Sequence, residues 1–127
     1  MKKGFTLIEL AAVIAIFTLA TALFFFQKND YDAIKRDEQR KTAINAMFYN
    51  LEEGFYEESS YYPETISEEN LKVMDPQLFT DPFGINVGDE YSNYRYEPAD
   101  CEDSKCASYT LRTTLEREDD FIKKSRH

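Results

Sequence analysis

The sequence is short of the residues that enzymes and metal sites commonly use. Its 127 residues include no tryptophan, two cysteines, four glycines and a single histidine, His127. It contains no glycine-rich phosphate loop and no G-x-S-x-G motif, so no nucleotide site and no esterase-type nucleophile is predicted. Adjacent acidic residues such as Glu52 and Glu53 do not face each other on a helix, and we interpret them as solvated charge. We therefore predict that the protein is not an enzyme.

Positive charge is also scarce. Fifteen Lys and Arg residues stand against 24 Asp and Glu residues, which gives a net charge of −9. An acidic surface repels phosphate backbones, so we expect no direct binding of nucleic acid. Without its apolar N-terminal segment the chain has about 100 residues, which is enough for one small domain with a modest core.

Residues that break helices are missing from the first half of the chain. No proline occurs before Pro63, and Gly54 is the only glycine between Gly4 and that proline. From Phe5 to Phe26 the only charged side chain is that of Glu9. A helix of this length is roughly 33 Å long and can cross a bilayer core. Apolar residues then return at helical spacing, at Ala43, Ile44, Met47, Phe48, Leu51 and Phe55. We predict one continuous helix from about residue 6 to about residue 56, whose second half lies under a folded head.

Glu9 needs a partner if it lies in lipid. An ionised carboxylate costs on the order of 2.5–3.5 kcal/mol at the bilayer centre and less near the interface. A cut after Gly4 would give Phe5 a free, positively charged α-amine. We expect the amine of one subunit to neutralise Glu9 of a neighbouring subunit.

The segment Lys3-Gly4-Phe5-Thr6-Leu7-Ile8-Glu9 resembles the processing motif of the type IV pilin superfamily, which comprises type IV pilins and the pseudopilins of type II secretion and DNA-uptake machines. The resemblance implies cleavage between Gly4 and Phe5 by a prepilin peptidase, N-methylation of Phe5, and assembly through Phe5 and Glu9. It also implies a homopolymer with other pilin-like subunits, and an assembly platform and a motor ATPase as partners. Many pilins carry a proline where this chain has Phe26, so the chain departs from them there.

The implied fold is α+β and pilin-like: a long N-terminal helix, apolar in its first half, packed by its second half on a small antiparallel sheet. The implied location is a single pass through the inner, or cytoplasmic, membrane, followed by an extracellular or envelope filament. Lys2 and Lys3 precede the helix and the acidic remainder follows it. This asymmetry places the head outside the cytoplasmic membrane.

Other interpretations stay open. Ala20-Thr21-Ala22 has the small-x-small form that signal peptidase recognises, although the apolar run continues to Phe26. The segment could instead be a plain single-span anchor for a surface-binding domain. Within the filament class, a pilus subunit, a minor pilin and a secretion or DNA-uptake pseudopilin are all compatible with the motif. The segment Asp81-Pro82-Phe83-Gly84 resembles one in the major pseudopilin of type II secretion.

We divide the chain into a leader (1–4), a transmembrane or filament-core helix (5–26), an amphipathic continuation (27–62), a globular head with a C-terminal hairpin (63–116) and a loose, charged tail (117–127). Within the head we predict a short helix from Ser67 to about Met74 and a turn at residues 81–84. Strands at 91–96 and 109–116 should form an antiparallel hairpin lying on the helix. In the second strand, alternate residues should face the core: Tyr109, Leu111, Thr113 and Leu115.

Cys101 and Cys106 are an even pair in a domain expected to be exported, so we predict a disulfide. A metal site would need a further soft ligand, and the only histidine is His127. Four acidic residues lie in the region where major pseudopilins bind calcium: Asp89, Asp100, Glu102 and Asp103. They match no fixed ligand spacing, so we favour a plain acidic loop over a calcium site.

Overall fold

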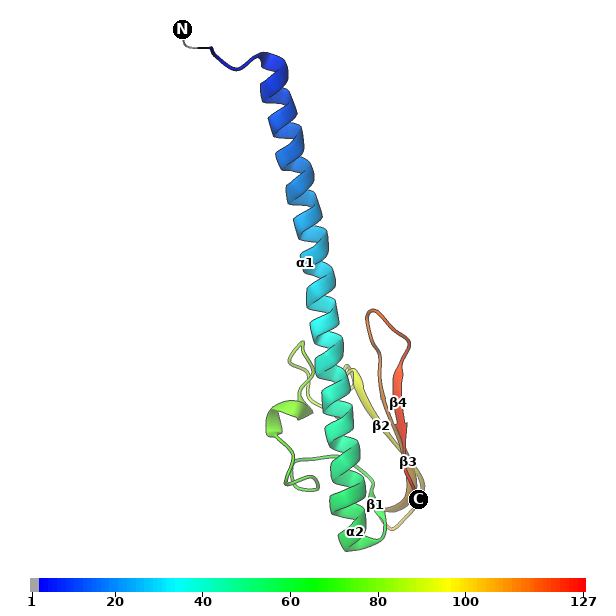
Figure 1. The fold of residues 1–127 in the computed structure, drawn as a ribbon. Helices are drawn as coiled ribbons and strands as arrows, with labels where there is room; N and C mark the ends of the chain where they lie inside the picture. Colours follow the sequence, from blue (N-terminus) through cyan, green and yellow to red (C-terminus); the bar gives the residue numbers. More distant parts are fainter. Residues whose placement is uncertain (1–2) are drawn as a thin grey trace. The chain divides into compact units, whose positions relative to one another are not determined.

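The computed structural model describes residues 3–127 (Figure 1). These form two compact units, one ending at Ala33 and the other spanning Ile34–His127. Helix α1 runs over Leu7–Tyr49 and continues as a π-helical segment, η1 (Asn50–Phe55), and a last turn, α2 (Tyr56–Ser59). Ser60 adopts a left-handed conformation with φ of 63° and ends the helical run. The predicted continuous helix is confirmed, whereas the sequence analysis did not predict its π-helical segment.

The head contains four strands in one antiparallel sheet. These are β1 (Tyr62–Pro63), β2 (Tyr94–Glu102), β3 (Lys105–Thr113) and β4 (Phe121–Lys124). Strand β3 is central, because it pairs with β2 along one edge and with β1 and β4 along the other. A short 3₁₀ helix, η2 (Pro76–Phe79), lies in the long connection between β1 and β2. The α+β, pilin-like arrangement of a long helix and a small antiparallel sheet is therefore confirmed.

The core of the head lies between the second half of α1 and one face of the sheet. The helix contributes Ala43, Ile44, Met47 and Leu51, each at most 1% exposed. The sheet contributes Tyr109, Leu111 and Thr113 of β3, which the alternation of that strand predicted, and Tyr94 of β2. The predicted hairpin is present, with Tyr94 opposite Thr113 and Tyr96 opposite Leu111.

A buried carboxylate lies in this core near the C-terminal end of the helical run. The interpretation of Glu52 as solvated charge was wrong: Glu52 of η1 is 3% exposed and accepts hydrogen bonds from the hydroxyls of Tyr62 (3.0 Å) and Tyr109 (2.7 Å). It also accepts one from the backbone N–H of Arg126 (3.0 Å). Burial, and then the nearby Glu52 carboxylate, raise the pKa of both tyrosines. One side chain thus joins the helix, two strands and the C-terminal segment.

Two expectations about local structure were wrong. Residues 67–74 form turns instead of a helix, with a single helical hydrogen bond from the Leu71 N–H to the Ser67 carbonyl (3.0 Å). Burial of Leu71 and Met74 against the core holds this segment in place without a regular helix. The tail is not loose, because Phe121–Lys124 form β4 on the edge of β3. By contrast, the turn at residues 81–84 is confirmed: the Gly84 N–H bonds the Asp81 carbonyl (2.9 Å), and Gly84 has φ of 84°.

Candidate functional site

The predicted cleavage point lies just outside the first helix. Gly4 and Phe5 precede α1, and the Phe5 side chain is 84% exposed. A Cβ placed on Gly4 would meet no atom within 4 Å, so the bond after it is open to the surroundings. Met1 and Lys2 of the predicted leader lie outside the described residues. The Gly4–Phe5 bond is therefore accessible and lies outside the helix.

Thr6 and Glu9 form a capping box at the start of α1. The Thr6 N–H and hydroxyl both donate to Glu9 Oε2, at 2.8 and 3.0 Å, and the Glu9 N–H donates to Thr6 Oγ1 at 3.3 Å. This reciprocal arrangement satisfies N–H groups that a helix start otherwise leaves unpaired. Glu9 Oε1 accepts no hydrogen bond from the residues that the structure describes. Glu9 therefore caps its own helix and still has one carboxylate oxygen available for a cationic partner.

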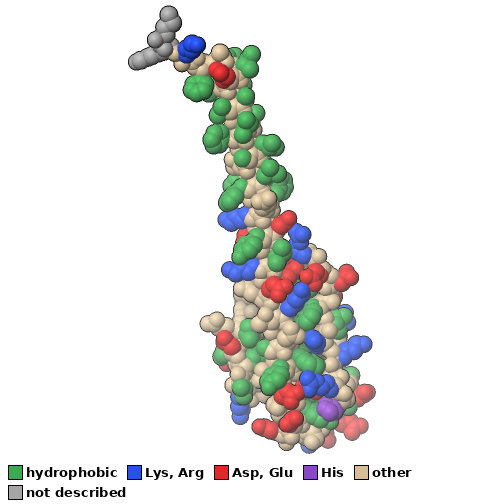
Figure 2. Space-filling view, viewed as in Figure 1, with side chains coloured by type: hydrophobic (Ala, Val, Ile, Leu, Met, Phe, Trp, Pro, Cys, Tyr) green, Lys and Arg blue, Asp and Glu red, His purple; other side chains and the backbone are tan. Residues whose placement is uncertain are grey.

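The segment after Glu9 exposes large apolar side chains along its length, and Figure 2 shows them on the face in view. The helical run that starts at Leu7 is long and apolar enough to cross a membrane by length and composition, with none of its most apolar window buried in the structure. Two threonines interrupt the segment, but their hydroxyls donate to backbone carbonyls one turn earlier: Thr18 to Ile14 (2.8 Å) and Thr21 to Phe17 (2.7 Å). The polar groups of this segment are thus satisfied internally, as a helix in lipid requires.

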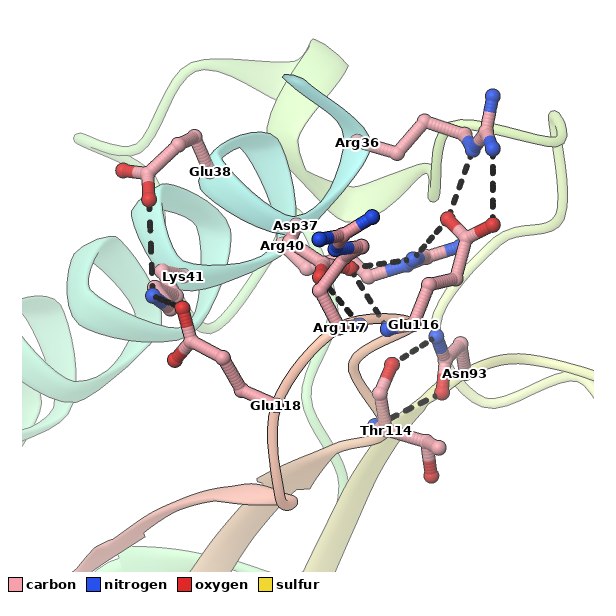
Figure 3. A network of polar contacts seen from close by, with 10 residues as sticks. All are labelled: Arg36, Asp37, Glu38, Arg40, Lys41, Asn93, Thr114, Glu116, Arg117 and Glu118. Carbon is pink, nitrogen blue, oxygen red and sulfur yellow. Dashed lines mark hydrogen bonds and ion pairs between the residues drawn. The ribbon is translucent and has the colours of Figure 1, made fainter. Parts of the chain in front are cut away.

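A polar network fixes the second half of α1 to the loop after β3 (Figure 3). Asp37, which is 2% exposed, accepts hydrogen bonds from the backbone N–H groups of Glu116 (2.9 Å) and Arg117 (3.0 Å). Arg40, equally buried, contacts Asp37 (3.0 Å) and Glu116 (2.8 Å). Arg36 completes the network with two bonds to the Glu116 carboxylate, at 2.7 and 2.8 Å.

The electrostatics of this network follow from its geometry. Burial pushes the pKa of Asp37 upward, but the two backbone N–H donors and Arg40 outweigh burial and hold that pKa below its ordinary value. Hydrogen bonds from Arg36, followed by those from Arg40, lower the pKa of Glu116 to about 2. Both carboxylates are therefore ionised and paired at neutral pH.

Sequence reasoning missed this network, since it described residues 27–62 only as an amphipathic continuation of the helix and named no buried charge there. A signal was present. Asp37 and Arg40 are in phase with the apolar stripe, because the steps from 37 through 40, 44 and 47 to 51 are three and four residues. Charges on the buried face of a helix indicate paired partners in the fold.

The remaining predicted site residues are the two cysteines and the four calcium candidates, and they lie in two regions of the head. Cys101 and Cys106 form the predicted disulfide across the turn between β2 and β3. Asp100, Glu102 and Asp103 surround that turn and line one cavity, whereas Asp89 lines a different cavity beside β2. Residues 3–127 include no group of three or more His, Cys, Asp or Glu side chains placed to hold a metal ion. The structure therefore does not bring the four calcium candidates together.

Comparison with known proteins bears on the N-terminal segment. No curated protein and no solved structure matches this chain. Residues 1–25 match the family model of the prokaryotic N-terminal methylation motif. The exposed Gly4–Phe5 bond, the capping Glu9 and the apolar helix all lie in or directly beside the matched residues. At residues 1–25 the chain thus carries the prokaryotic N-terminal methylation motif, which is the signature of type IV pilins and pseudopilins.

Proposed function

We propose that this protein is a structural filament subunit that is cut after Gly4, N-methylated on Phe5, and polymerised through its N-terminal helix into a type IV pilus or a related filament. Before assembly the helix spans the cytoplasmic membrane and the head lies outside it. A prepilin peptidase, an assembly platform and a motor ATPase are the partners this role requires. The observation that carries the proposal is the exposed apolar segment with Glu9 as its one carboxylate.

The energetics of assembly explain why Glu9 matters. Lipid tails are as apolar as the helix surface, so leaving lipid for a filament core gives little hydrophobic gain. A charge pair in a medium of low dielectric constant is far stronger than in water. The amine of a processed Phe5 in one subunit and the unoccupied Oε1 of Glu9 in another supply such a pair. Assembly is then favoured only when neighbouring helices are placed so that these two groups meet.

The first test is intact mass and N-terminal fragmentation of the protein in a sheared cell-surface fraction. We expect a chain that starts at N-methylated Phe5 and is abundant in that fraction. A chain that starts at Leu23 would show cleavage by signal peptidase and contradict the proposal. A chain that retains Met1 and stays in membranes would indicate a plain single-span anchor.

The second test replaces Glu9. Glu9→Ala should leave the protein in the membrane but lower filament yield by about tenfold or more, because a charge-assisted bond worth about 1.5–3 kcal/mol is lost at each contact. Thr6→Val is the matched control, since it weakens the same cap but keeps the Glu9 carboxylate. Filament yield that falls equally in both variants would assign Glu9 to capping alone.

A further inference from the structure

Strand β2 forms one outer edge of the sheet, and the strand register fixes which of its backbone groups point outward. The Ser125 N–H bonds the Tyr109 carbonyl at 3.1 Å, so the backbone groups of Tyr109 point to the β4 side of β3. Successive residues of a strand point these groups to opposite edges, so those of Arg112, three residues later, bond Arg95 of β2. The N–H and C=O of the next residue, Tyr96, therefore point to the free edge of β2.

The backbone groups of Tyr96 have no partner on this edge. Among residues 3–127, no hydrogen bond from outside the sheet reaches the Tyr96 N–H or C=O. Two residues away on either side, the Tyr94 N–H bonds the Ser92 hydroxyl (3.2 Å), and Pro98 has no N–H. An unpaired strand edge is a template on which a further extended chain can add. Tyr96 is thus the central position of a short stretch that can receive a strand.

A cavity of about 340 Å³ lies beside this edge. It is lined by residues 94–97 of β2 and by residues 64–66 and 87–90 of the connection that precedes the strand. Ile66 and Val87 give it an apolar surface, and its volume is in the range of sites that hold a ligand group. A chain added to β2 would therefore have room for a side chain next to Tyr96.

The charges around the cavity favour a cationic side chain. Four carboxylates and one guanidinium line it on exposed residues: Glu64, Asp89, Glu90, Glu97 and Arg95. Within residues 3–127 none of these five groups is in ion-pair contact. A lysine or arginine can lay its aliphatic stem on Ile66 and Val87 and hold its charge among the carboxylates. An acidic side chain would be repelled by the same carboxylates.

The described part of this chain has no free, extended, basic segment that could fill the cavity. Beyond the leader, adjacent cations occur at Lys35–Arg36 and Arg40–Lys41, both in α1, and at Lys123–Lys124 in β4. Strand β4 is already paired with β3, and Lys123 lies over the Phe48 ring of α1 at 5.5 Å from its centroid. A basic strand added at this edge therefore has to come from another protein.

We propose that the free edge of β2 binds an extended, basic segment of another protein as an added strand, and that a lysine or arginine of this segment enters the cavity beside Asp89 and Glu90. The backbone of Tyr96 supplies hydrogen bonds that any extended chain can use, and the carboxylates select for positive charge. This binding uses the head alone. It goes beyond the proposed filament role and does not depend on it.

The first test measures amide hydrogen exchange by NMR in the full chain, kept unassembled in detergent. The probe is a short peptide of alternating threonine and valine with one central lysine, blocked at both ends. In the free chain the Tyr96 amide should exchange faster than the amides of Arg95 and Glu97, which bond β3. Saturating peptide should slow exchange at Tyr96 by about tenfold or more. A Tyr96 amide as protected as that of Arg95 in the free chain, or unchanged by the peptide, would overturn the proposal.

The second test measures the affinity of the same peptide by fluorescence anisotropy. Asp89→Asn combined with Glu90→Gln should weaken binding by about tenfold or more, because two charge-assisted contacts are lost. Glu102→Gln combined with Asp103→Asn is the matched control. It removes the same charge from exposed residues outside this cavity and should change the affinity by less than about twofold.

A third arm changes the peptide instead of the protein. Replacing its lysine by glutamate should abolish binding. Equal affinity of the two double variants, or equal affinity of the lysine and glutamate peptides, would contradict the proposal. All measurements use the unassembled chain, so their failure would leave the filament role intact, and a chain that forms no filaments would not alter them.

Discussion

At the scale of single residues, Glu52 is the acid whose loss the fold should tolerate least. Its carboxylate satisfies two buried phenol hydroxyls and one backbone N–H. Glu52→Ala would leave all three donors without this acceptor, at about 1–3 kcal/mol for each unsatisfied buried group. We expect the free energy of unfolding to fall by about 3–5 kcal/mol, measured by thermal or urea unfolding of the full chain in detergent. Glu57→Ala, at an exposed position of α2, is the control and should change it by less than about 0.5 kcal/mol.

A second residue-scale prediction concerns pH. The pKa of Glu116 is lowered from 4.5 to about 2, and that of Asp37 is also lowered. A carboxyl whose pKa is lower in the folded state binds fewer protons there than in the unfolded state, so its stabilisation is present above the unfolded pKa and is lost as pH falls toward the folded one. We therefore expect stability to decrease between about pH 4.5 and pH 2. Glu116→Gln should make Tm less dependent on pH in this window, and an unchanged slope would contradict the assignment.

At the scale of elements, Gly54 weakens the helical run that supports the head. A Cβ at this position would meet no atom within 4 Å, and Gly54 has no positive φ. Glycine inside a helix costs roughly 0.5–1 kcal/mol relative to alanine, so Gly54→Ala should raise the free energy of unfolding by about that amount. Gly84→Ala is the informative contrast. It also has open space, but its φ of 84° disfavours any side chain, so it should lower stability.

The elements that sequence could predict are those with long, regular patterns. The helix stripe at Ala43, Ile44, Met47 and Leu51 and the alternation along β3 are confirmed because burial against one face imposes a period. The prediction of a helix after Ser67 was wrong because the N-cap signal at Ser67 is satisfied by a single turn. Burial of Leu71 and Met74 determines the conformation of the remaining residues. The candidate site, too, could be predicted only in part. The short motif around Glu9 could be predicted, whereas the polar network at Asp37 joins residues 79 positions apart and could not.

At the scale of the whole molecule, the C-terminal segment is a structural part of the head. Strand β4 pairs with β3, and Lys123 and Arg126 place their cationic groups over the Phe48 ring, at 5.5 and 5.3 Å from its centroid. Deleting residues 119–127 should therefore destabilise the head by about 3 kcal/mol or more, because this strand and the Arg126 bond to Glu52 are lost together. Ile122→Thr, at a half-exposed position of β4, should have a much smaller effect. A truncated chain with the wild-type Tm would restore the loose-tail interpretation.

In the proposed filament, the hydrogen bonds that Thr18 and Thr21 make within their own helix would affect the accuracy of assembly. Both hydroxyls already donate hydrogen bonds within their own helix. The apolar segment beyond Glu9 can therefore contact a neighbouring copy through its shape but not through a directional hydrogen bond. Two such helices that slide along each other meet similar surfaces at many offsets, so packing alone distinguishes those offsets poorly. Discrimination between a correct and a shifted neighbour then depends on the single carboxylate at Glu9. A misplaced neighbouring helix would be disfavoured only through its lost contact with Glu9 near the helix start, and the rest of the apolar segment would add no further discrimination.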